Sequence, residues 1–286
     1  MSAAAQLDRH IAQWRLTRDA EPFETHSSWL CFVRQGERRA LLKIFKPGSD
    51  EVPSARYFAA HKGSGTVRVL QSDGDAILIE RISPGTRLTE LSAQGRDDEA
   101  SHIICDTIEK LQQSHADIAG WPGHDEHLAQ FTRCRAAPPV TTEIAARAAD
   151  SFRALNASQD QHVLLHGDLH HENILFDQER GWLAIDPKGE IGELAYEIAA
   201  PLRNPLESPD LFMLPAEMDR RVHIYCERLQ LDRERVLGWC FARNASAALW
   251  YAGRTPEPLR DKAWSAATLT ALELLQDHGR RAAEPR

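Results

Sequence analysis

Short apolar runs separated by turn residues dominate the first third of the chain and predict strands. The predicted strands cover residues 29–34, 39–46, 67–71 and 76–82. The first two are joined by a turn through Gly36, and the last two form a hairpin that turns at Asp73-Gly74. The sequence Ser83-Pro84-Gly85 then ends the pattern, because proline and glycine interrupt regular structure.

Beyond this break, apolar residues recur at helical spacing. The periodicity is clear over residues 97–116, and the Ala-rich stretch 145–149 is most simply helical. A sheet-rich beginning followed by a helical remainder indicates an α+β fold with two lobes. We expect a small β-rich N-terminal lobe over residues 1–82 and a larger helical C-terminal lobe over residues 83–286.

One segment of the predicted helical lobe carries unusual polar residues. An apolar strand ends in His166-Gly167-Asp168, a polar turn follows, and Asn173 opens a second apolar strand. A third apolar run, residues 182–185, ends abruptly at Asp186-Pro187. Carboxylates rarely lie beside buried apolar runs unless something pairs with them. A magnesium ion and a phosphate chain would be suitable partners.

The spacing His-x-Asp-x-x-x-x-Asn is the catalytic-loop pattern of kinases. In such a loop Asp168 would accept the proton of the attacking hydroxyl, while Asn173 and Asp186 would supply oxygen ligands for magnesium. Alternatively, these residues only cap a turn and end a strand. That interpretation explains each residue singly but not their joint spacing, so we expect a protein-kinase-like fold with this loop in its larger lobe.

Composition and charge narrow the class of partner. The apolar fraction of 42% and the charged fraction of 27% are ordinary for a globular protein. The start of the chain lacks a secretory signal and no apolar run approaches a membrane span, so we expect a cytoplasmic protein. Its five scattered cysteines agree with reduced thiols. The net charge of −8 disfavours a nucleic-acid partner and favours a cationic small molecule.

The extended string from Leu165 to Leu175, Leu-His-Gly-Asp-Leu-His-His-Glu-Asn-Ile-Leu, followed by Ala-Ile-Asp-Pro-Lys-Gly, resembles the aminoglycoside phosphotransferase family. It is most similar to the streptomycin 6-phosphotransferase branch, also called the aminoglycoside/hydroxyurea resistance kinases. The stretch from Trp239 to Trp250 is similar to a late helix of that branch. The resemblance implies transfer of the γ-phosphoryl group of ATP or GTP, with Mg²⁺, to the 6-hydroxyl of streptomycin, which inactivates the antibiotic.

On the nucleotide side, Lys43 is the candidate phosphate-binding lysine, because it lies mid-strand between apolar neighbours. An edge-strand lysine that discourages aggregation is the alternative. Glu51 is the predicted acid partner of Lys43. The polar residues Ser27 and Ser28 are candidates for a phosphate loop, since no glycine-rich motif precedes Lys43. The predicted adenine-binding hinge runs from Ile79 to Ile82, and within it Glu80 and Ile82 are the candidate nucleotide contacts.

On the acceptor side, Glu190 and Glu193 are the carboxylates nearest in sequence to Asp186 and are the candidate ligands for a cationic sugar. Glu197 matches a structural acid of the family. Three aromatic residues could form a wall of the acceptor site, although Trp239 fits core packing better; they are Trp239, Trp250 and Tyr251.

Other functions compete with this hypothesis. The histidine cluster 162–171 lacks a complete zinc-ligand spacing, which disfavours a metalloenzyme. A kinase of the same fold could instead act on a metabolic amino alcohol, a sugar or a ketosamine. A catalytically silent nucleotide-binding module is a further alternative, but such proteins usually lack one of the three polar residues found here.

Overall fold

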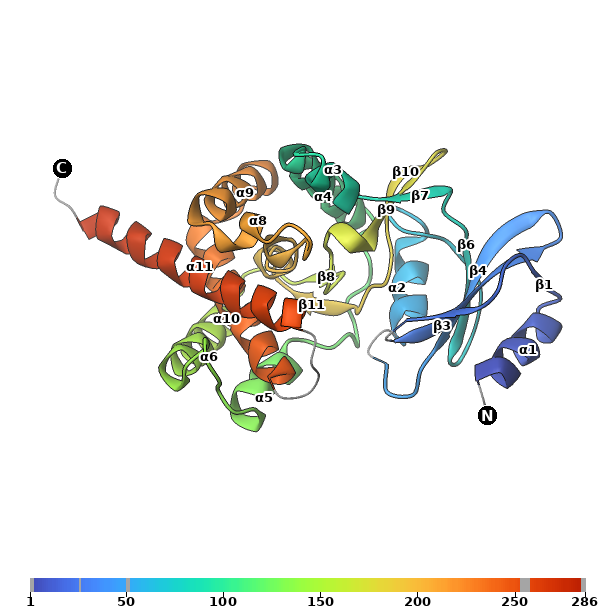
Figure 1. The fold of residues 1–286 in the computed structure, drawn as a ribbon, viewed down its shortest axis with the longest axis horizontal. Helices are drawn as coiled ribbons and strands as arrows, with labels where there is room; N and C mark the ends of the chain where they lie inside the picture. Colours follow the sequence, from blue (N-terminus) through green and yellow to red (C-terminus); the bar gives the residue numbers. More distant parts are fainter. Residues whose placement is uncertain (1–2, 26, 50–51, 253–257, 284–286) are drawn as a thin grey trace.

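The computed structural model describes residues 3–25, 27–49, 52–252 and 258–283. A β-rich part and a helical part lie side by side, with the N-terminal sheet at one end and the C-terminal helix at the other (Figure 1). The β-rich part contains α1 (Ala3–Gln13), β1 (Thr17–Arg18), β2 (Phe23–Glu24), β3 (Ser28–Gln35), β4 (Arg38–Phe45), α2 (Ser54–His61), β5 (Val69–Asp73) and β6 (Ala76–Glu80).

These strands form one antiparallel sheet in the order β1-β3-β4-β6-β5, and β2 pairs with β3. The four strands predicted from the pattern correspond to β3, β4, β5 and β6, within one to two residues at each end. The predicted turns are present, with Gly36 and Gly74 at φ values of 61° and 56°. Such positive φ values favour glycine because it has no Cβ.

The alternation of β4 decides where its side chains lie. Leu42 and Ile44 pack with Leu7 and Trp14 of α1 on one face of the sheet. Phe45 belongs to the larger core, which includes Tyr57 and Phe58 of α2. Side chains two residues apart share a face, so Lys43 lies on the same face as Phe45 and points away from α1.

The helical part begins with a strand that the pattern did not predict. Residues 84–87 form β7, although proline and glycine at residues 84 and 85 indicated only a break. This strand lies at the edge of the small sheet β10-β9-β7, where a missing N–H is tolerated. The remaining strands are β8 (Val163–Leu165), β9 (Ile174–Asp177), β10 (Gly181–Ala184) and β11 (Glu190–Gly192).

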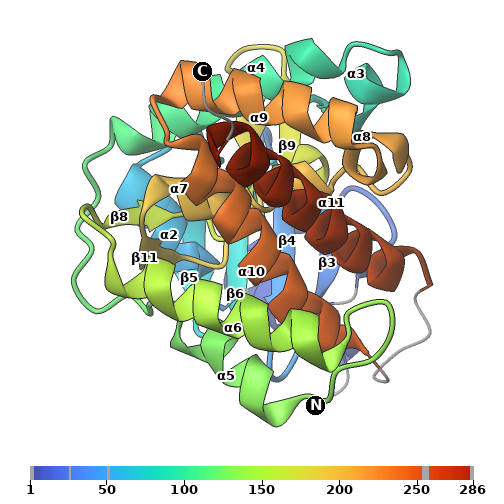
Figure 2. The same cartoon turned by 90° about the vertical axis from the view of Figure 1, so that its left-hand side faces the viewer.

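The helices of this part pack around α10, which is buried along most of its length. Figure 2 shows α6, α10 and α11 in front of the strands. The predicted helix 97–116 corresponds to α4 and ends at Gln112. The helical elements are α3 (Thr89–Ala93), α4 (Asp97–Gln112), α5 (Asp125–Arg133), α6 (Thr142–Ala157), η1 (His171–Asn173), α7 (Leu194–Glu197), η2 (Pro201–Arg203), α8 (Asp210–Met213), α9 (Pro215–Leu229), α10 (Arg233–Tyr251) and α11 (Pro258–Ala283).

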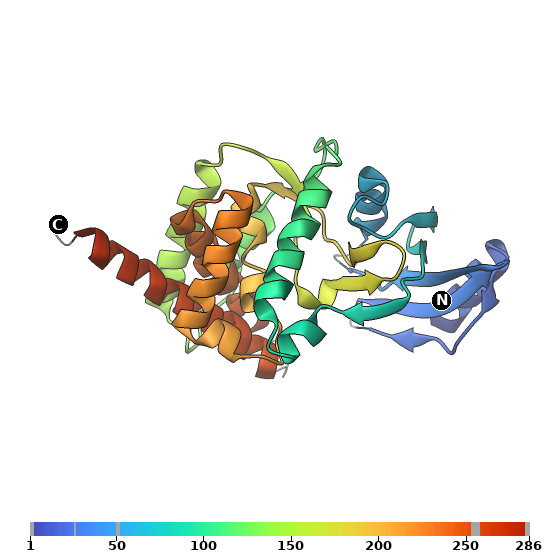
Figure 3. The same cartoon turned by 90° about the horizontal axis from the view of Figure 1, so that it is seen from above.

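The hairpin β9–β10 lies between the helices and the N-terminal sheet (Figure 3). The N–H of Ala184 donates to the carbonyl of Gly65 at 2.8 Å, and Thr66 forms a parallel bridge with Ala184. Every strand of the larger sheet precedes residue 81, and the lobe boundary at residues 82/83 stays a prediction. No described helix combines the length and apolar character that a membrane span requires.

Candidate active site

The loop between β8 and β9 is held by its own histidine. The Nε2–H of His166 donates to the carbonyl of Ile185 at 2.8 Å, and Nδ1 accepts the N–H of Asp168 at 3.3 Å. Burial lowers the pKa of His166 to about 4, so the ring is neutral and offers one donor and one acceptor, as these bonds require. These two bonds tie the loop to the residue that precedes Asp186.

A buried acid fixes the same loop from the other side. Glu197 of α7 accepts the N–H groups of Gly167 at 3.1 Å and Leu169 at 3.4 Å. Arg243 of α10 donates to the carbonyl oxygens of Gly167 and Tyr196. Burial raises the pKa of Glu197, against the nearby charge of Arg243. These contacts leave Glu197 turned toward the loop backbone, as expected for a structural acid.

The Asp168 carboxylate lies among three cationic groups. Arg203 of η2 donates to Oδ1 at 2.7 Å, while Nε2 of His170 and Nζ of Lys188 lie 3.6 Å and 4.0 Å from Oδ2. Burial alone would raise the pKa of Asp168, but Lys188, His170 and Arg203 hold it well below its usual range. The carboxylate is therefore ionised at neutral pH, as a proton acceptor must be.

His170 lies between two acids. Its Nδ1 is 2.5 Å from Oε2 of Glu172, on the side opposite Asp168. Burial opposes the charge of His170, but Asp168 and Glu172 raise its pKa to about 9. His170, Glu172, Lys188 and Arg203 were not among the site residues predicted from the sequence. Arg203 follows Asp168 by 35 residues, and no motif spacing links the two.

Lys43 and Asp186 meet across the two parts of the molecule. Nζ of Lys43 lies 2.5 Å from Oδ1 of Asp186, and Lys43 is only 2% exposed. The alternative of an edge-strand lysine is wrong, because β4 is an inner strand between β3 and β6. Asp186 follows β10 with φ at 56°, a left-handed conformation that Asp adopts more readily than most residues. Its side chain keeps 37% of its surface exposed.

The oxygen donors near this pair fit a magnesium ion. The side-chain N–H of Asn173 donates to the carbonyl of Asp168 at 2.9 Å, which turns the amide oxygen away from that carbonyl. Asn173 ends η1, one residue before β9, rather than opening the strand. Magnesium usually takes one or two carboxylate or amide oxygens, with phosphates and water completing its octahedron. Asn173 and Asp186 would hold it, and the phosphates would then lie near Lys43.

The polar residues predicted to bind phosphate form the turn between β2 and β3. The N–H of Thr25 donates to the carbonyl of Ser28 at 2.8 Å, and the N–H of Ser28 donates to Oγ1 of Thr25 at 3.1 Å. Ser27 lies in this turn, whereas Ser28 is buried and begins β3. Lys46, the residue after β4, forms an ion pair with Glu24 at 2.7 Å and not with Asp186. Glu51, the predicted partner of Lys43, lies outside the described residues.

The predicted hinge is held by an arginine. Arg180, in the turn between β9 and β10, donates to Oε1 of Glu80 and to the carbonyl oxygens of Gly63 and Thr66. The carboxylate of Glu80 also accepts the N–H of Arg68 at 2.9 Å, so this side chain has structural partners. Ile82 follows β6 outside the ladder, and its N–H has no backbone partner among the described residues.

The two predicted acceptor carboxylates are already paired. Glu190 is 8% exposed and faces His127 at 3.1 Å and His124 at 3.4 Å. Glu193 bonds the guanidinium of Arg235 at 2.6 Å and the indole N–H of Trp239. These contacts argue against both predictions. Glu190 turns inward because β11 pairs with β8, so that its register partner is Leu165.

The predicted aromatic residues differ in burial. Trp239 is fully buried, as core packing predicts. Tyr251, at the end of α10, is partly exposed and stacks on Trp264 of α11 with centroids 4.2 Å apart. Trp264 was not predicted, since it lies beyond the late helix that carried the resemblance. Its ring centroid is 5.8 Å from Cζ of Arg203.

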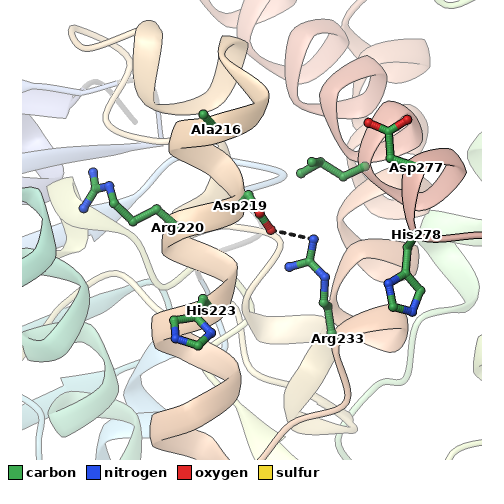
Figure 4. A pocket seen from close by; sticks show the side chains of 8 residues that line it. Ala216, Asp219, Arg220, His223, Arg233, Asp277 and His278 are labelled. Atoms are coloured by element: carbon green, nitrogen blue, oxygen red, sulfur yellow. Dashed lines mark ion pairs between the residues drawn. The ribbon is translucent and has the colours of Figure 1, made fainter. Parts of the chain in front are cut away.

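His166, His170 and His171 have separate partners, and within the described ranges no three His, Cys, Asp or Glu side chains are arranged to hold a metal. The five cysteines are free, and three are buried. A cavity of about 490 Å³ lies between α9 and α11, where Asp219 pairs with Arg233 at 2.5 Å (Figure 4). None of the catalytic-loop residues lines it, so it is separate from this site.

Known proteins are similar to this chain in sequence and in fold. The family model for aminoglycoside/hydroxyurea antibiotic resistance kinases matches residues 13–254. Streptomycin 3''-kinase of Klebsiella pneumoniae is 38% identical over 85% of this chain and 91% of its own length. Streptomycin 6-kinase of Streptomyces griseus is 28% identical over 86% of this chain and 82% of its own length.

Among solved structures, the choline kinase LicA from Streptococcus pneumoniae superposes with a TM-score of 0.65 at 13% identity, covering 94% of this chain and 99% of LicA. This likeness confirms the predicted protein-kinase-like fold. The chain therefore belongs to the aminoglycoside/hydroxyurea antibiotic resistance kinase family and is a phosphotransferase.

Proposed function

We propose that this protein transfers the γ-phosphoryl group of ATP to a hydroxyl of streptomycin and thereby inactivates the antibiotic. The observation that carries the proposal is the meeting of two pairs of residues at the junction of the lobes. Lys43 of the sheet contacts Asp186 at 2.5 Å, and Asp168 and Asn173 lie on the loop joined to Asp186 through His166 and Ile185. Phosphoryl transfer needs a cation for the phosphates, oxygen ligands for magnesium and a carboxylate for the acceptor hydroxyl.

Each of these residues has a task in the reaction. Lys43 binds the phosphates of the nucleotide, since a buried cation needs an anionic partner. A magnesium ion held by Asn173 and Asp186 would offset the charge that develops on the phosphate oxygens. Asp168 orients the acceptor hydroxyl in line with the γ-phosphate and takes its proton. Ser27 and the backbone of the β2–β3 turn contact the phosphates, and Ile82 binds the adenine edge through its main chain.

Two hydroxyl groups of streptomycin are candidates for phosphorylation. The resemblance to the streptomycin 6-phosphotransferase branch implied the 6-hydroxyl. The higher identity to a 3''-kinase, 38% against 28% for a 6-kinase, favours the 3''-hydroxyl instead. We therefore propose the 3''-hydroxyl, with the 6-hydroxyl as the second candidate. The net charge of −8 on the protein attracts this cationic acceptor, whichever hydroxyl is phosphorylated.

A coupled ADP-release assay with ATP, Mg²⁺ and streptomycin tests the proposal, and NMR of the product identifies the phosphorylated hydroxyl. Asp168→Ala should lower kcat by about 10³-fold or more while ATP still binds, since the proton acceptor is lost. Glu179→Ala, which alters an exposed acid remote from the loop, is the matched control. The proposal is wrong if the wild type phosphorylates choline, ethanolamine, a sugar or a ketosamine but not streptomycin.

A further inference from the structure

Arg203 is a buried cation directed at the proposed catalytic base. It is 7% exposed, and its Nη2 donates to Oδ1 of Asp168 at 2.7 Å. Its Nη1 reaches only the carbonyl of Ala199, at 3.4 Å. Burying a guanidinium is costly unless an acid pairs with it. The position of Arg203 is therefore explained by Asp168, and not by the packing of η2.

The C-terminal helix contributes to this pair. Trp264 of α11 is 8% exposed, and its ring faces the guanidinium with a centroid-to-Cζ distance of 5.8 Å. This distance is within the range of a cation–π contact. Stacking on Tyr251 holds the indole in place. Helix α11 starts on the side of the helical part that faces the sheet and runs away from it (Figure 1). It lies beyond the family-matched residues 13–254.

The two oxygens of Asp168 have different surroundings. Oδ1 is taken by a short hydrogen bond from Arg203. Oδ2 faces His170 and Lys188 at 3.6 Å and 4.0 Å, longer than ordinary hydrogen bonds. Oδ2 is therefore the oxygen with room to accept the hydrogen of the acceptor hydroxyl. A reacting hydroxyl must be held within a few tenths of an ångström of its in-line position, so the carboxylate must not rotate.

We propose that Arg203, supported by Trp264, is a positioning residue that holds the Asp168 carboxylate with Oδ2 turned toward the acceptor. The proposal rests on the proposed function, because it assigns an orientation to the base of that reaction. The planar guanidinium of arginine suits this role better than lysine, which would offer a point charge with no fixed plane. The proposal also makes α11 part of the active site.

Steady-state kinetics of Arg203→Ala and Arg203→Lys test the proposal. Arg203→Ala should lower kcat about 10²-fold with KM for ATP within about twofold of wild type, because only the acceptor's alignment is lost. Arg203→Lys should recover part of that loss. Guanidinium chloride at about 10 mM should raise kcat of Arg203→Ala about tenfold by refilling the space between Asp168 and Trp264. Trp264→Phe, which keeps an aromatic face, should stay closer to wild type than Trp264→Ala.

Arg221 provides the matched control. It is also buried, but its guanidinium bonds the carbonyls of Pro201 and Asn204 and contacts Asp97, not Asp168. Arg221→Ala should lower stability, and guanidinium should not raise its kcat. An unchanged kcat in Arg203→Ala overturns the proposal. A loss that neither guanidinium nor the lysine variant relieves also overturns it, because that pattern indicates a purely structural arginine.

Crystal structures of the wild type and of Arg203→Ala, with and without guanidinium, test the orientation without any acceptor. The Asp168 carboxylate should leave its wild-type rotamer in the variant and return to it when guanidinium binds. A carboxylate that does not move overturns the role of Arg203 even if streptomycin is phosphorylated. If streptomycin is not an acceptor, the proposed function fails, and the carboxylate orientation still decides this inference.

Discussion

Replacing Glu197 with alanine should destabilise the protein severely, because this acid holds the catalytic loop. Its Oε1 accepts the N–H of Gly167 at 3.1 Å and that of Leu169 at 3.4 Å, and both donors are buried. Leaving a buried N–H without a partner costs about 1–3 kcal/mol each. The buried Arg243 would also lose a nearby negative charge, which adds to the loss.

These contributions overlap, so we expect a loss of about 4 kcal/mol, a large part of the roughly 5–15 kcal/mol that stabilises a domain. Glu197→Gln should cost only about 1–2 kcal/mol, since its amide oxygen can still accept both N–H groups while the burial of a charge is avoided. Urea unfolding followed by tryptophan fluorescence and circular dichroism measures both variants. The exposed Glu179→Ala serves as a control and should stay within about 0.5 kcal/mol of wild type.

Two results would refute this reasoning. One is a Glu197→Ala variant whose free energy of unfolding lies within about 1 kcal/mol of the wild-type value, because the loop would then need no buried acid. The other is a glutamine variant as unstable as the alanine variant. In that case the charge of Glu197, and not its hydrogen bonds to Gly167 and Leu169, would hold the loop.

Further predictions concern the cleft and its surroundings. Lys43→Met should raise KM for ATP more than about tenfold, and an unchanged KM would contradict phosphate binding by this lysine. Asn173→Ala should raise the magnesium concentration for half-maximal rate about tenfold without altering KM for streptomycin. Glu193→Gln should lower stability by about 1–2 kcal/mol and leave KM for streptomycin within twofold; a selective rise in that KM would restore its predicted role in acceptor binding. Burial lowers the pKa of His61 to about 4, below its unfolded value, so its stabilising contribution is present above pH 6.5 and is lost as pH falls through 4. The free energy of unfolding of the wild type should therefore fall by about 2 kcal/mol between pH 7 and pH 5 through this residue. If the urea midpoint shifts equally between these pH values in wild type and in His61→Leu, the prediction is contradicted.

The local sequence pattern was sufficient to find candidate residues that lie close together in the sequence. Asp168 and Asn173 lie on one loop, and Asp186 follows the hairpin that starts there, so a single segment of sequence contained all three. The side of the sheet on which Lys43 lies followed from strand alternation. Four strands of the larger sheet, β3 to β6, were also predicted, because their apolar runs are bounded by glycine-containing turns, whereas the two-residue strands β1 and β2 were missed.

Long-range packing decided the rest. Glu190 and Glu193 are close to Asp186 in sequence, but the pairing of β11 with β8 turns one toward His124 and His127, and Arg235 takes the other. Arg203 and Trp264 reach the base only through the packing of η2 against α11, and no periodicity encodes that contact. β7 was missed because Pro84 and Gly85 indicated a break, while the open edge of β9 provided a partner for the strand.

The contact between Lys43 and Asp186 has a consequence for how a nucleotide enters. Each side chain already neutralises the other, so binding is an exchange of counter-ions and not an addition of charges to an empty cleft. In the proposed reaction Asp186 would exchange its lysine for a metal ion, and Lys43 would exchange its carboxylate for a phosphate. Such an exchange would keep both charges compensated, which matters for a lysine only 2% exposed. The affinity for nucleotide is then the difference between two sets of ion pairs, which makes it less sensitive to salt than the number of phosphate charges suggests.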